Sequence, residues 1–233
     1  MHTAYCSEIK KDTIAIELNE IESNHVVKVL RRQEGDVLLI SNGKGIKAIG
    51  TIKLAHPKKC LISVQSMEEE KPTKDFVHIA IAPTKNMDRL EWFVEKATEI
   101  GVDKITLLQC KNNERKVVKM DRLEKIALSA MKQSQRFYLP ELVELTSFKD
   151  FVKANPNGAV AHCYDELINN QEKRSIVNWK MSGPVLIGPE GDFTQEEVKL
   201  ALENQYTSLD LGKNRLRTET AALTVVTLLA FNR

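Results

Sequence analysis

The segment Ile187-Gly188-Pro189-Glu190-Gly191-Asp192-Phe193 decides the fold class. It continues the apolar run Val185–Ile187, which reads as a buried strand. Thr194 follows, with Glu197 three residues later, and this pair is the signature of a capping box at the start of a helix. A strand, a loop with glycines and a helix in this order are typical of an α/β domain with a mainly parallel sheet.

The same alternation of strand and helix extends from this segment in both directions. Apolar runs predict strands at residues 76–82, 104–110, 158–162, 185–187 and 208–211. Helical spacing predicts helices at residues 87–100, 121–136, 148–154 and 220–231, besides the one that begins at Thr194. In the helix at 87–100, Leu90, Phe93 and Ala97 share one face, and Gly101 is placed as its C-terminal stop.

The first seventy residues have a different pattern. Strands are expected at residues 13–18, 36–40, 46–54 and 60–64, and Asn42-Gly43 is a strong turn signal between two of them. One helix is expected at about residues 20–32, with its apolar side made by Ile21, His25, Val26, Val29 and Leu30. Several short strands with one helix suggest a small β-barrel. The charged, proline-containing segment Glu68–Lys74 then marks a boundary, so we expect domains at residues 1–70 and 75–233.

Length and composition exclude several classes of protein. The chain has 233 residues and a formal net charge of +2, from 34 Lys and Arg against 32 Asp and Glu. No apolar run is long enough for a membrane span, and the first residues do not resemble a signal peptide. The widely spaced cysteines and scattered histidines offer no zinc or disulfide pattern. We therefore expect a cytoplasmic protein with reduced thiols and no bound metal.

Positive charge is concentrated locally between Lys111 and Arg136. Eight basic residues stand there against three acidic ones, which gives the segment a net charge of +5. Such a segment can bind phosphate groups by releasing counterions, although a solvated helix face gives the same pattern. Arg89 and Lys96 lie seven residues apart on one helix face, and solvent-side charges of an amphipathic helix explain them equally well.

Two loops follow predicted strands and are candidates for ligand binding, because ligands bind beyond the carboxyl ends of parallel strands. The loop at 188–191 has two glycines, but it matches neither GxGxxG nor GxxxxGK[ST], and it is also compatible with an ordinary strand-to-helix connection. In the loop at 211–220, Arg215 and Arg217 can clamp a phosphate or orient a planar base. Glu219 is a possible proton acceptor there, whereas Thr218 and Thr220 also suit a helix cap.

At these residues the chain closely resembles the RsmE family of 16S ribosomal RNA uridine-N3 methyltransferases, members of the knotted SPOUT superfamily. The two loops are the most specific part of the resemblance. The matching pieces appear in the family order and cover essentially the whole chain: His25 with Val29-Leu30-Arg31, Lys85, Glu95–Val102, Arg115, Gln133–Arg136, Ile187–Gly191, and Leu211-Gly212 through Leu216–Ala221. Many relatives have glycine at the position of Asp192, and many have an arginine near the N-terminus, where this chain has His2-Thr3-Ala4.

The resemblance implies a fold and a cofactor. The N-terminal part would be a PUA-like or OB-like barrel that helps to hold RNA. The C-terminal part would be a SPOUT α/β domain with a parallel sheet, whose backbone forms a trefoil knot, and the protein would be a homodimer. The resemblance places S-adenosylmethionine at the two loops, against Leu186, Ile187, Gly188, Pro189, Glu190, Gly191, Leu211, Gly212, Leu216 and Thr220.

The resemblance also implies an activity, the methylation of N3 of a uridine in the 16S ribosomal RNA of the small subunit. The N3 proton must leave and the developing charge on the base must be stabilised, which suggests Arg217 and Arg215 as catalytic residues and Glu219 as the general base. Contacts with the RNA are expected from Arg31, Arg32, Lys85, Arg115 and Arg136. Assembled small subunits are the expected substrate.

Two other functions compete with the methyltransferase. The first is a noncatalytic RNA-binding factor of ribosome assembly with the same fold, which need not bind the cofactor. The intact loops at 188–191 and 217–220 argue against it. The second is a nucleotide-dependent oxidoreductase, which lacks its glycine motif and a suitably placed ribose-binding acid.

Overall fold

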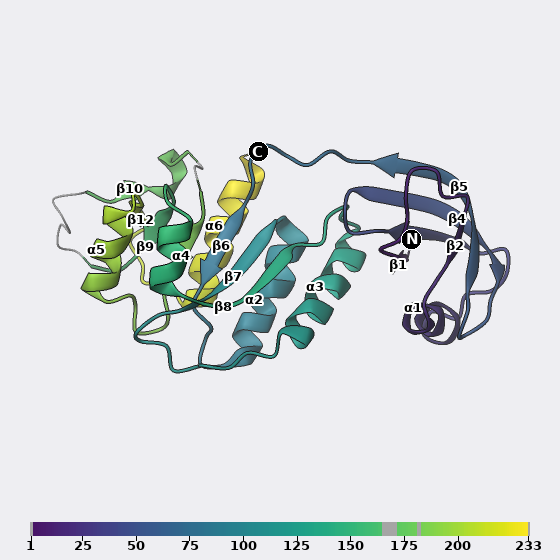
Figure 1. Ribbon diagram of the computed structural model, residues 1–233, viewed down its shortest axis with the longest axis horizontal. Helices are drawn as coiled ribbons and strands as arrows, with labels where there is room; N and C mark the ends of the chain where they lie inside the picture. The colour runs from purple at the N-terminus through teal and green to yellow at the C-terminus, as the bar shows by residue number, and fades with distance from the viewer. Residues whose placement is uncertain (1, 165–171, 181–182, 233) are drawn as a thin grey trace. The chain divides into compact units, whose positions relative to one another are not determined.

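A computed structural model of the chain describes residues 2–164, 172–180 and 183–232 (Figure 1). The chain forms two compact units. The first consists of Met1–Pro72 with Leu128–Leu139, and the second of Thr73–Ala127 with Pro140–Arg233. Helix α3 (Met120–Ser134) therefore begins in the second unit and ends in the first.

The first unit is built on a five-stranded, mostly antiparallel sheet. Its strands are β1 (Thr3–Tyr5), β2 (Ala15–Glu17), β3 (Val37–Ser41), β4 (Ile46–Leu54) and β5 (Leu61–Glu69), in the order β1-β3-β4-β5-β2. Only the β1–β3 pair is parallel. The Asn42-Gly43 turn joins β3 to β4 as predicted, and the Asn42 side-chain oxygen accepts the backbone N–H groups of Lys44 and Ile46. Such a small curled sheet is the barrel expected for this part of the chain.

The helix expected at residues 20–32 is shorter, and its buried face was wrongly predicted. It consists of α1 (Glu20–Asn24) and a π-helical turn, η1 (His25–Val29). Val26 is buried, but Ile21 and Val29 are exposed, while Glu22 and Ser23 are buried in their place. The reason is hydrogen bonding: the Ser23 hydroxyl donates to the Leu18 carbonyl, and Glu22 accepts bonds from the backbone N–H of Tyr5 and from Lys132.

The C-terminal end of α3 and the residues after it complete the first unit. Lys132 forms an ion pair with the buried Glu22 at 2.7 Å. The backbone of Phe137 accepts a bond from Gly45, and Leu139 donates one to Gly43, so this segment runs along the β3–β4 turn. These contacts between residues far apart in the sequence could not be read from local patterns.

The second unit is an α/β domain with a seven-stranded parallel sheet, which confirms the predicted fold class (Figure 1). Every strand pair is parallel. The order β10-β12-β9-β11-β6-β7-β8 is made by β6 (His78–Ile81), β7 (Lys104–Gln109), β8 (Glu141–Ser147), β9 (Ala159–Ala161), β10 (Arg174–Ser175), β11 (Val185–Ile187) and β12 (Thr207–Asp210).

Helices cover both faces of this sheet. On one face α4 (Phe148–Ala154) and α5 (Gln195–Glu203) pack together over a core that includes Val160 and Leu186. On the other, α6 (Thr218–Phe231) packs on β6, β11 and α2 (Met87–Ile100). A short 3-10 helix, η2 (Ile176–Asn178), adjoins α6. In the three described ranges, no helix is long and apolar enough to cross a membrane.

Local signals fix the ends of several of these helices. Helix α2 has the predicted bounds: Asn86 caps its start through the backbone N–H of Asp88, and Gly101 ends it at φ 136°. Helix α5 starts at the predicted capping box of Thr194 and Glu197.

Strands β8 and β10 were not predicted, because both lie at the edges of the sheet and have few buried apolar residues.

Candidate cofactor-binding site

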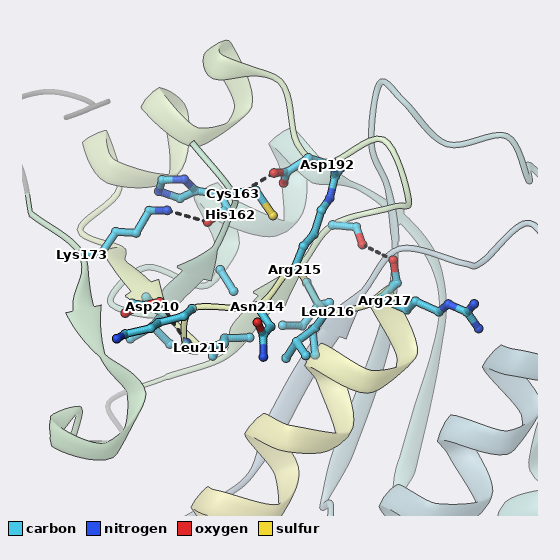
Figure 2. A pocket seen from close by; sticks show the side chains of 18 of the residues that line it. His162, Cys163, Lys173, Asp192, Asp210, Leu211, Asn214, Arg215, Leu216 and Arg217 are labelled. Atoms are coloured by element: carbon cyan, nitrogen blue, oxygen red, sulfur yellow. Dashed lines mark hydrogen bonds between the residues drawn. The ribbon is translucent and has the colours of Figure 1, made fainter. Parts of the chain in front are cut away.

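A cavity of about 870 Å³ lies at the carboxyl ends of β9, β11 and β12 (Figure 2). The two glycine-containing loops form much of its wall. Its lining residues are Ala161, His162, Cys163, Glu172, Lys173, Ile187, Gly188, Pro189, Glu190, Asp192, Leu209, Asp210, Leu211, Gly212, Lys213, Asn214, Arg215, Leu216, Arg217, Thr218 and Ala221. This edge of a parallel sheet is where α/β proteins bind ligands.

The loop after β11 is tightly fastened to its surroundings. A side chain at Gly188 would meet the backbone nitrogen and the ring of Phe193 at about 3.1 Å, so any other residue would require Phe193 to shift by a few tenths of an ångström. The Thr218 hydroxyl, at the start of α6, donates to the Gly188 carbonyl at 3.0 Å. The two walls of the cavity are therefore bonded to each other.

Asp192 joins this loop to β9. Its carboxylate accepts the backbone N–H of Cys163 at 2.7 Å through one oxygen and that of Phe193 at 2.7 Å through the other. Asp192 has φ 63°, in the left-handed region that favours glycine. These two bonds explain how a non-glycine residue stands at a position where the resemblance expects glycine.

The loop after β12 forms the opposite wall. Gly212 has φ 115° and donates its N–H to the Asp210 carboxylate at 3.0 Å. Figure 2 shows Arg215 directed toward Asp192 and Cys163, whereas the Arg217 guanidinium points away from the cavity. The two arginines therefore have different surroundings.

His162 and Cys163 also line the cavity, and the sequence analysis missed both. His162 Nε2 lies 3.1 Å from the Ser208 hydroxyl, and burial lowers the pKa of its imidazole to about 4, so it is neutral at pH 7. Partial burial raises the pKa of the Cys163 thiol, which keeps it protonated at pH 7. The signal available in the sequence was their place directly after the β9 strand.

A network of bonds that includes the cavity-lining Glu190 joins three loops. Glu190 accepts the backbone N–H of Lys85 at 2.9 Å, and Lys85 forms an ion pair with Glu114 at 2.8 Å. Arg115 donates to the carbonyls of Thr84 and Lys85. Lys85 and Arg115, both predicted RNA contacts, are thus brought together in the second unit.

The other predicted RNA contacts belong to the first unit. Arg31 is exposed at φ 53°, Arg32 lies 3.8 Å from Asp36, and Arg136 follows helix α3. Arg136 donates its backbone N–H to the Met131 carbonyl.

Comparison with known proteins identifies the family. Residues 69–230 match the model of an RNA methyltransferase domain, and residues 18–65 match that of an RNA methyltransferase PUA domain. A protein of Rickettsia conorii named ribosomal RNA small subunit methyltransferase E is 30% identical over 216 residues, covering 91% of this chain and 87% of that protein. The chain belongs to this methyltransferase E family.

Solved structures agree with this methyltransferase E assignment. A "probable rRNA-methyltransferase" from Porphyromonas gingivalis has a TM-score of 0.87 and 35% identity, and the likeness covers all of both chains. A methyltransferase from Legionella pneumophila, solved with bound S-adenosylmethionine, has a TM-score of 0.85 and 26% identity over 99% of this chain and 97% of that one.

Most, but not all, of the predicted site residues of this methyltransferase E chain line the cavity. Ile187, Gly188, Pro189, Glu190, Leu211, Gly212, Leu216, Arg215 and Arg217 do so. Leu186 points into the core beneath α4 and α5, Gly191 lies beside Asn112, and Thr220 is exposed on α6. Glu219 is buried beside Arg89 of α2 and does not belong to the cavity lining.

Proposed function

We propose that this protein transfers the methyl group of S-adenosylmethionine to N3 of a uridine in the 16S ribosomal RNA of the small subunit. The observation that carries the proposal is the cavity between the loops at 188–193 and 211–217 in a chain of the methyltransferase E family. The Rickettsia conorii relative carries small-subunit methylation in its name, and the Legionella pneumophila neighbour holds the cofactor.

The residues of the cavity fit S-adenosylmethionine. A volume of about 870 Å³ is in the range of cavities that bind molecules of this size. Leu209, Leu211 and Leu216 offer apolar surface to an adenine ring, and Asp192 and Asp210 offer negative charge to an amino group or a sulfonium. When bound, the cofactor supplies a methyl group on a positively charged sulfur, which an in-line nucleophile removes without a metal.

The chain's own task is to position the uracil and to stabilise its anion. N3 carries a proton, and loss of that proton places negative charge on the ring and its carbonyl oxygens. A guanidinium close to those oxygens favours the charged form and lowers the cost of deprotonation. Arg215, which lines the cavity, and Arg217, at the start of α6, are the groups that we propose for this role; the Arg217 guanidinium, which points away from the cavity, must turn toward the uracil to fill it. A preformed cavity also holds the reacting atoms in line.

The role of Glu219 as the general base remains a prediction. Its carboxylate is 8% exposed and packs toward α2. A base must come within hydrogen-bond reach of the N3 proton, and a side chain outside the cavity lining needs a rearrangement to do so.

We further propose that residues 1–70 act as the RNA-binding PUA domain and residues 75–233 as the catalytic domain. Arg31, Arg32 and Arg136 of the first unit would contact the RNA, with Lys85 and Arg115 of the second. A homodimer is proposed because α2 and α6 leave large apolar side chains exposed, Trp92 and Phe231. We propose that the protein works in the cytoplasm, where small subunits are assembled.

Calorimetric titration with S-adenosylmethionine, followed by transfer of labelled methyl groups to small subunits that lack the modification, tests the proposal. Binding at one site per chain and incorporation of one methyl group per subunit are expected. Failure to bind the cofactor would favour the noncatalytic assembly factor. Binding without transfer to small subunits would contradict the proposed substrate.

A further inference from the structure

Glu219 makes an unusual ion pair with Arg89 of α2. Its side chain is 8% exposed, and its Oε1 lies 3.7 Å from Arg89 Nε, too far for a good hydrogen bond. Its other oxygen, Oε2, is buried and has no hydrogen-bond partner among the described residues. Burying a carboxylate that is only partly compensated costs free energy, so the arrangement calls for a role other than stability.

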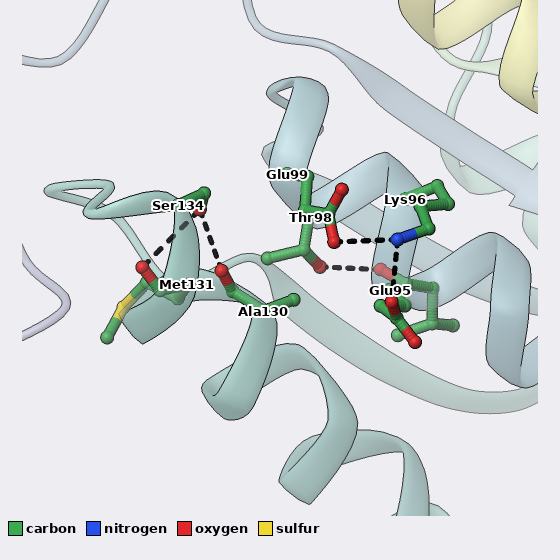
Figure 3. Close-up of polar contacts among 8 residues, drawn as sticks. Glu95, Lys96, Thr98, Glu99, Ala130, Met131 and Ser134 are labelled. Atoms are coloured by element: carbon green, nitrogen blue, oxygen red, sulfur yellow. Dashed lines mark hydrogen bonds and ion pairs between the residues drawn. The ribbon is translucent and has the colours of Figure 1, made fainter. Parts of the chain in front are cut away.

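The other ion pairs of α2 have short distances, unlike the pair of Arg89 and Glu219. Arg122 contacts both oxygens of Glu91, at 2.6 and 2.7 Å. Lys96 contacts Glu95 at 2.7 Å and Glu99 at 2.9 Å (Figure 3). Among these pairs, that of Arg89 and Glu219 has a loose, one-sided geometry. The pair of Arg32 and Asp36 in the first unit is also long, at 3.8 Å, but its carboxylate side chain is 40% exposed, whereas that of Glu219 is 8% exposed.

Arg89 lies beyond the carboxyl end of β6, on the same side of the sheet as the cavity. It stands in the first turn of α2, directly after the loop at 82–86 that follows β6 and bonds to Glu190 and Arg115. Its partner Glu219 stands in the first turn of α6, between the cavity-lining Thr218 and the rest of that helix. The Arg89 side chain is 37% exposed and that of Glu219 is 8% exposed, so the pair joins a solvent-accessible cationic side chain to a buried carboxylate.

We propose that Arg89 binds a phosphate group of the RNA strand beside the target uridine, and that Glu219 is the positioning residue that orients it. The inference rests on the proposed function. A guanidinium has five N–H donors in a planar fork, and only Nε approaches Glu219 here. The two terminal nitrogens match the geometry of a phosphate, which binds arginine through paired hydrogen bonds.

This assignment and the general-base role of Glu219 predict different kinetics. A positioning residue acts through Arg89, so its removal raises KM for the RNA and has little effect once Arg89 is gone. A general base acts on the uridine itself, so its removal lowers kcat by at least about a hundredfold, whatever residue stands at position 89. A double-mutant cycle separates the two.

The variants are Arg89→Gln, Arg89→Lys, Glu219→Gln and the double variant, and Lys104→Gln is the matched control. Lys104 also forms an ion pair, with Glu141 at 3.1 Å, but at the amino ends of β7 and β8. Methyl transfer to small subunits gives kcat and KM for each variant, and calorimetry gives the affinity for S-adenosylmethionine. Thermal denaturation checks that each variant folds.

We expect Arg89→Gln to raise KM for the small subunit about tenfold, with cofactor affinity unchanged. Loss of one phosphate contact should also reduce the dependence of binding on salt, by about one unit of slope on a logarithmic plot. Arg89→Lys should recover part of the loss, and the double variant should be no worse than Arg89→Gln. Lys104→Gln should behave as the unchanged protein.

Two results would overturn the inference. One is an unchanged KM and salt dependence in Arg89→Gln and in the double variant, which has no unpaired buried carboxylate, when thermal denaturation shows that both are folded. The other is a loss of kcat in Glu219→Gln that persists in full in the double variant, as a general base requires. RNA binding and its salt dependence are measured without turnover, so failure of the proposed methyl transfer remains distinguishable from failure of this inference.

Discussion

The Asp192 carboxylate accepts the backbone N–H of Cys163 at 2.7 Å and thereby fastens the loop after β11 to the end of β9. Both residues line the cavity, so the bond helps to form the site before any ligand arrives. Asp192 also bonds to the N–H of Phe193 while it holds φ 63°. The carboxylate therefore offsets the backbone strain of its own residue.

Replacement of Asp192 tests this balance. Asp192→Ala loses both hydrogen bonds and keeps the left-handed backbone, so we expect it to lower the free energy of unfolding by about 2 kcal/mol. Asp192→Gly loses the same bonds but adopts this φ freely, and it should be about 1 kcal/mol more stable than Asp192→Ala. Denaturant titration measures both. Equal stability of the two variants would show that φ at this position is unstrained.

Gly212 tests the role of the loop after β12 in binding the cofactor, and Gly35 is its control. Both have positive φ, 115° and 90°, and an added Cβ would meet no atom within 4 Å at either. Replacement by alanine should destabilise each by about 1 kcal/mol, since only backbone strain is introduced. Only Gly212→Ala should weaken binding of S-adenosylmethionine, because Gly212 lines the cavity and Gly35 belongs to the first unit. Equal cofactor affinity in the two variants would place the ligand elsewhere.

Because His78 and His162 are buried, we expect the free energy of unfolding to fall in mild acid. Burial lowers the pKa of His78 and of His162 to about 4, below the value of about 6.5 expected in the unfolded chain. The unfolded state then binds more protons than the folded state between pH 6.5 and 4, so stability falls as the pH falls through this window. Each histidine should contribute up to about 3 kcal/mol to the loss.

Denaturant titrations at several pH values measure the effect. His162→Gln and His78→Gln should each flatten the decline between pH 6.5 and 4, whatever they do to stability at pH 7. An unchanged slope in both variants would mean that other groups, such as carboxylates, cause the acid sensitivity.

The elements that were predicted well have strong local signals. Helix α2 has apolar residues at helical spacing and a glycine stop, and its predicted and observed bounds coincide. The buried strand β11 and the glycine loop after it were recognisable, because parallel strands are continuous apolar runs and glycine lets the backbone approach its neighbours closely. The candidate cavity follows from the same loops.

The parts that were missed depend on contacts between distant residues. The buried face of α1 is set by Glu22, whose partner Lys132 is 110 residues away. His162 and Lys173 reach the cavity because β9 and β10 lie on either side of β12. Glu219 lies two residues from Arg217, yet the turn of α6 aims it at α2 and away from the cavity.

The most direct test of the central claim is to identify the nucleotide that the purified protein modifies on small ribosomal subunits lacking the modification, with S-adenosylmethionine as the only methyl donor. Nuclease digestion and mass spectrometry of the 16S RNA locate the added methyl group. We expect one N3-methyluridine per subunit, with none when the cofactor is omitted. A methyl group on another atom or base, or no methyl group despite cofactor binding, would contradict the proposed activity.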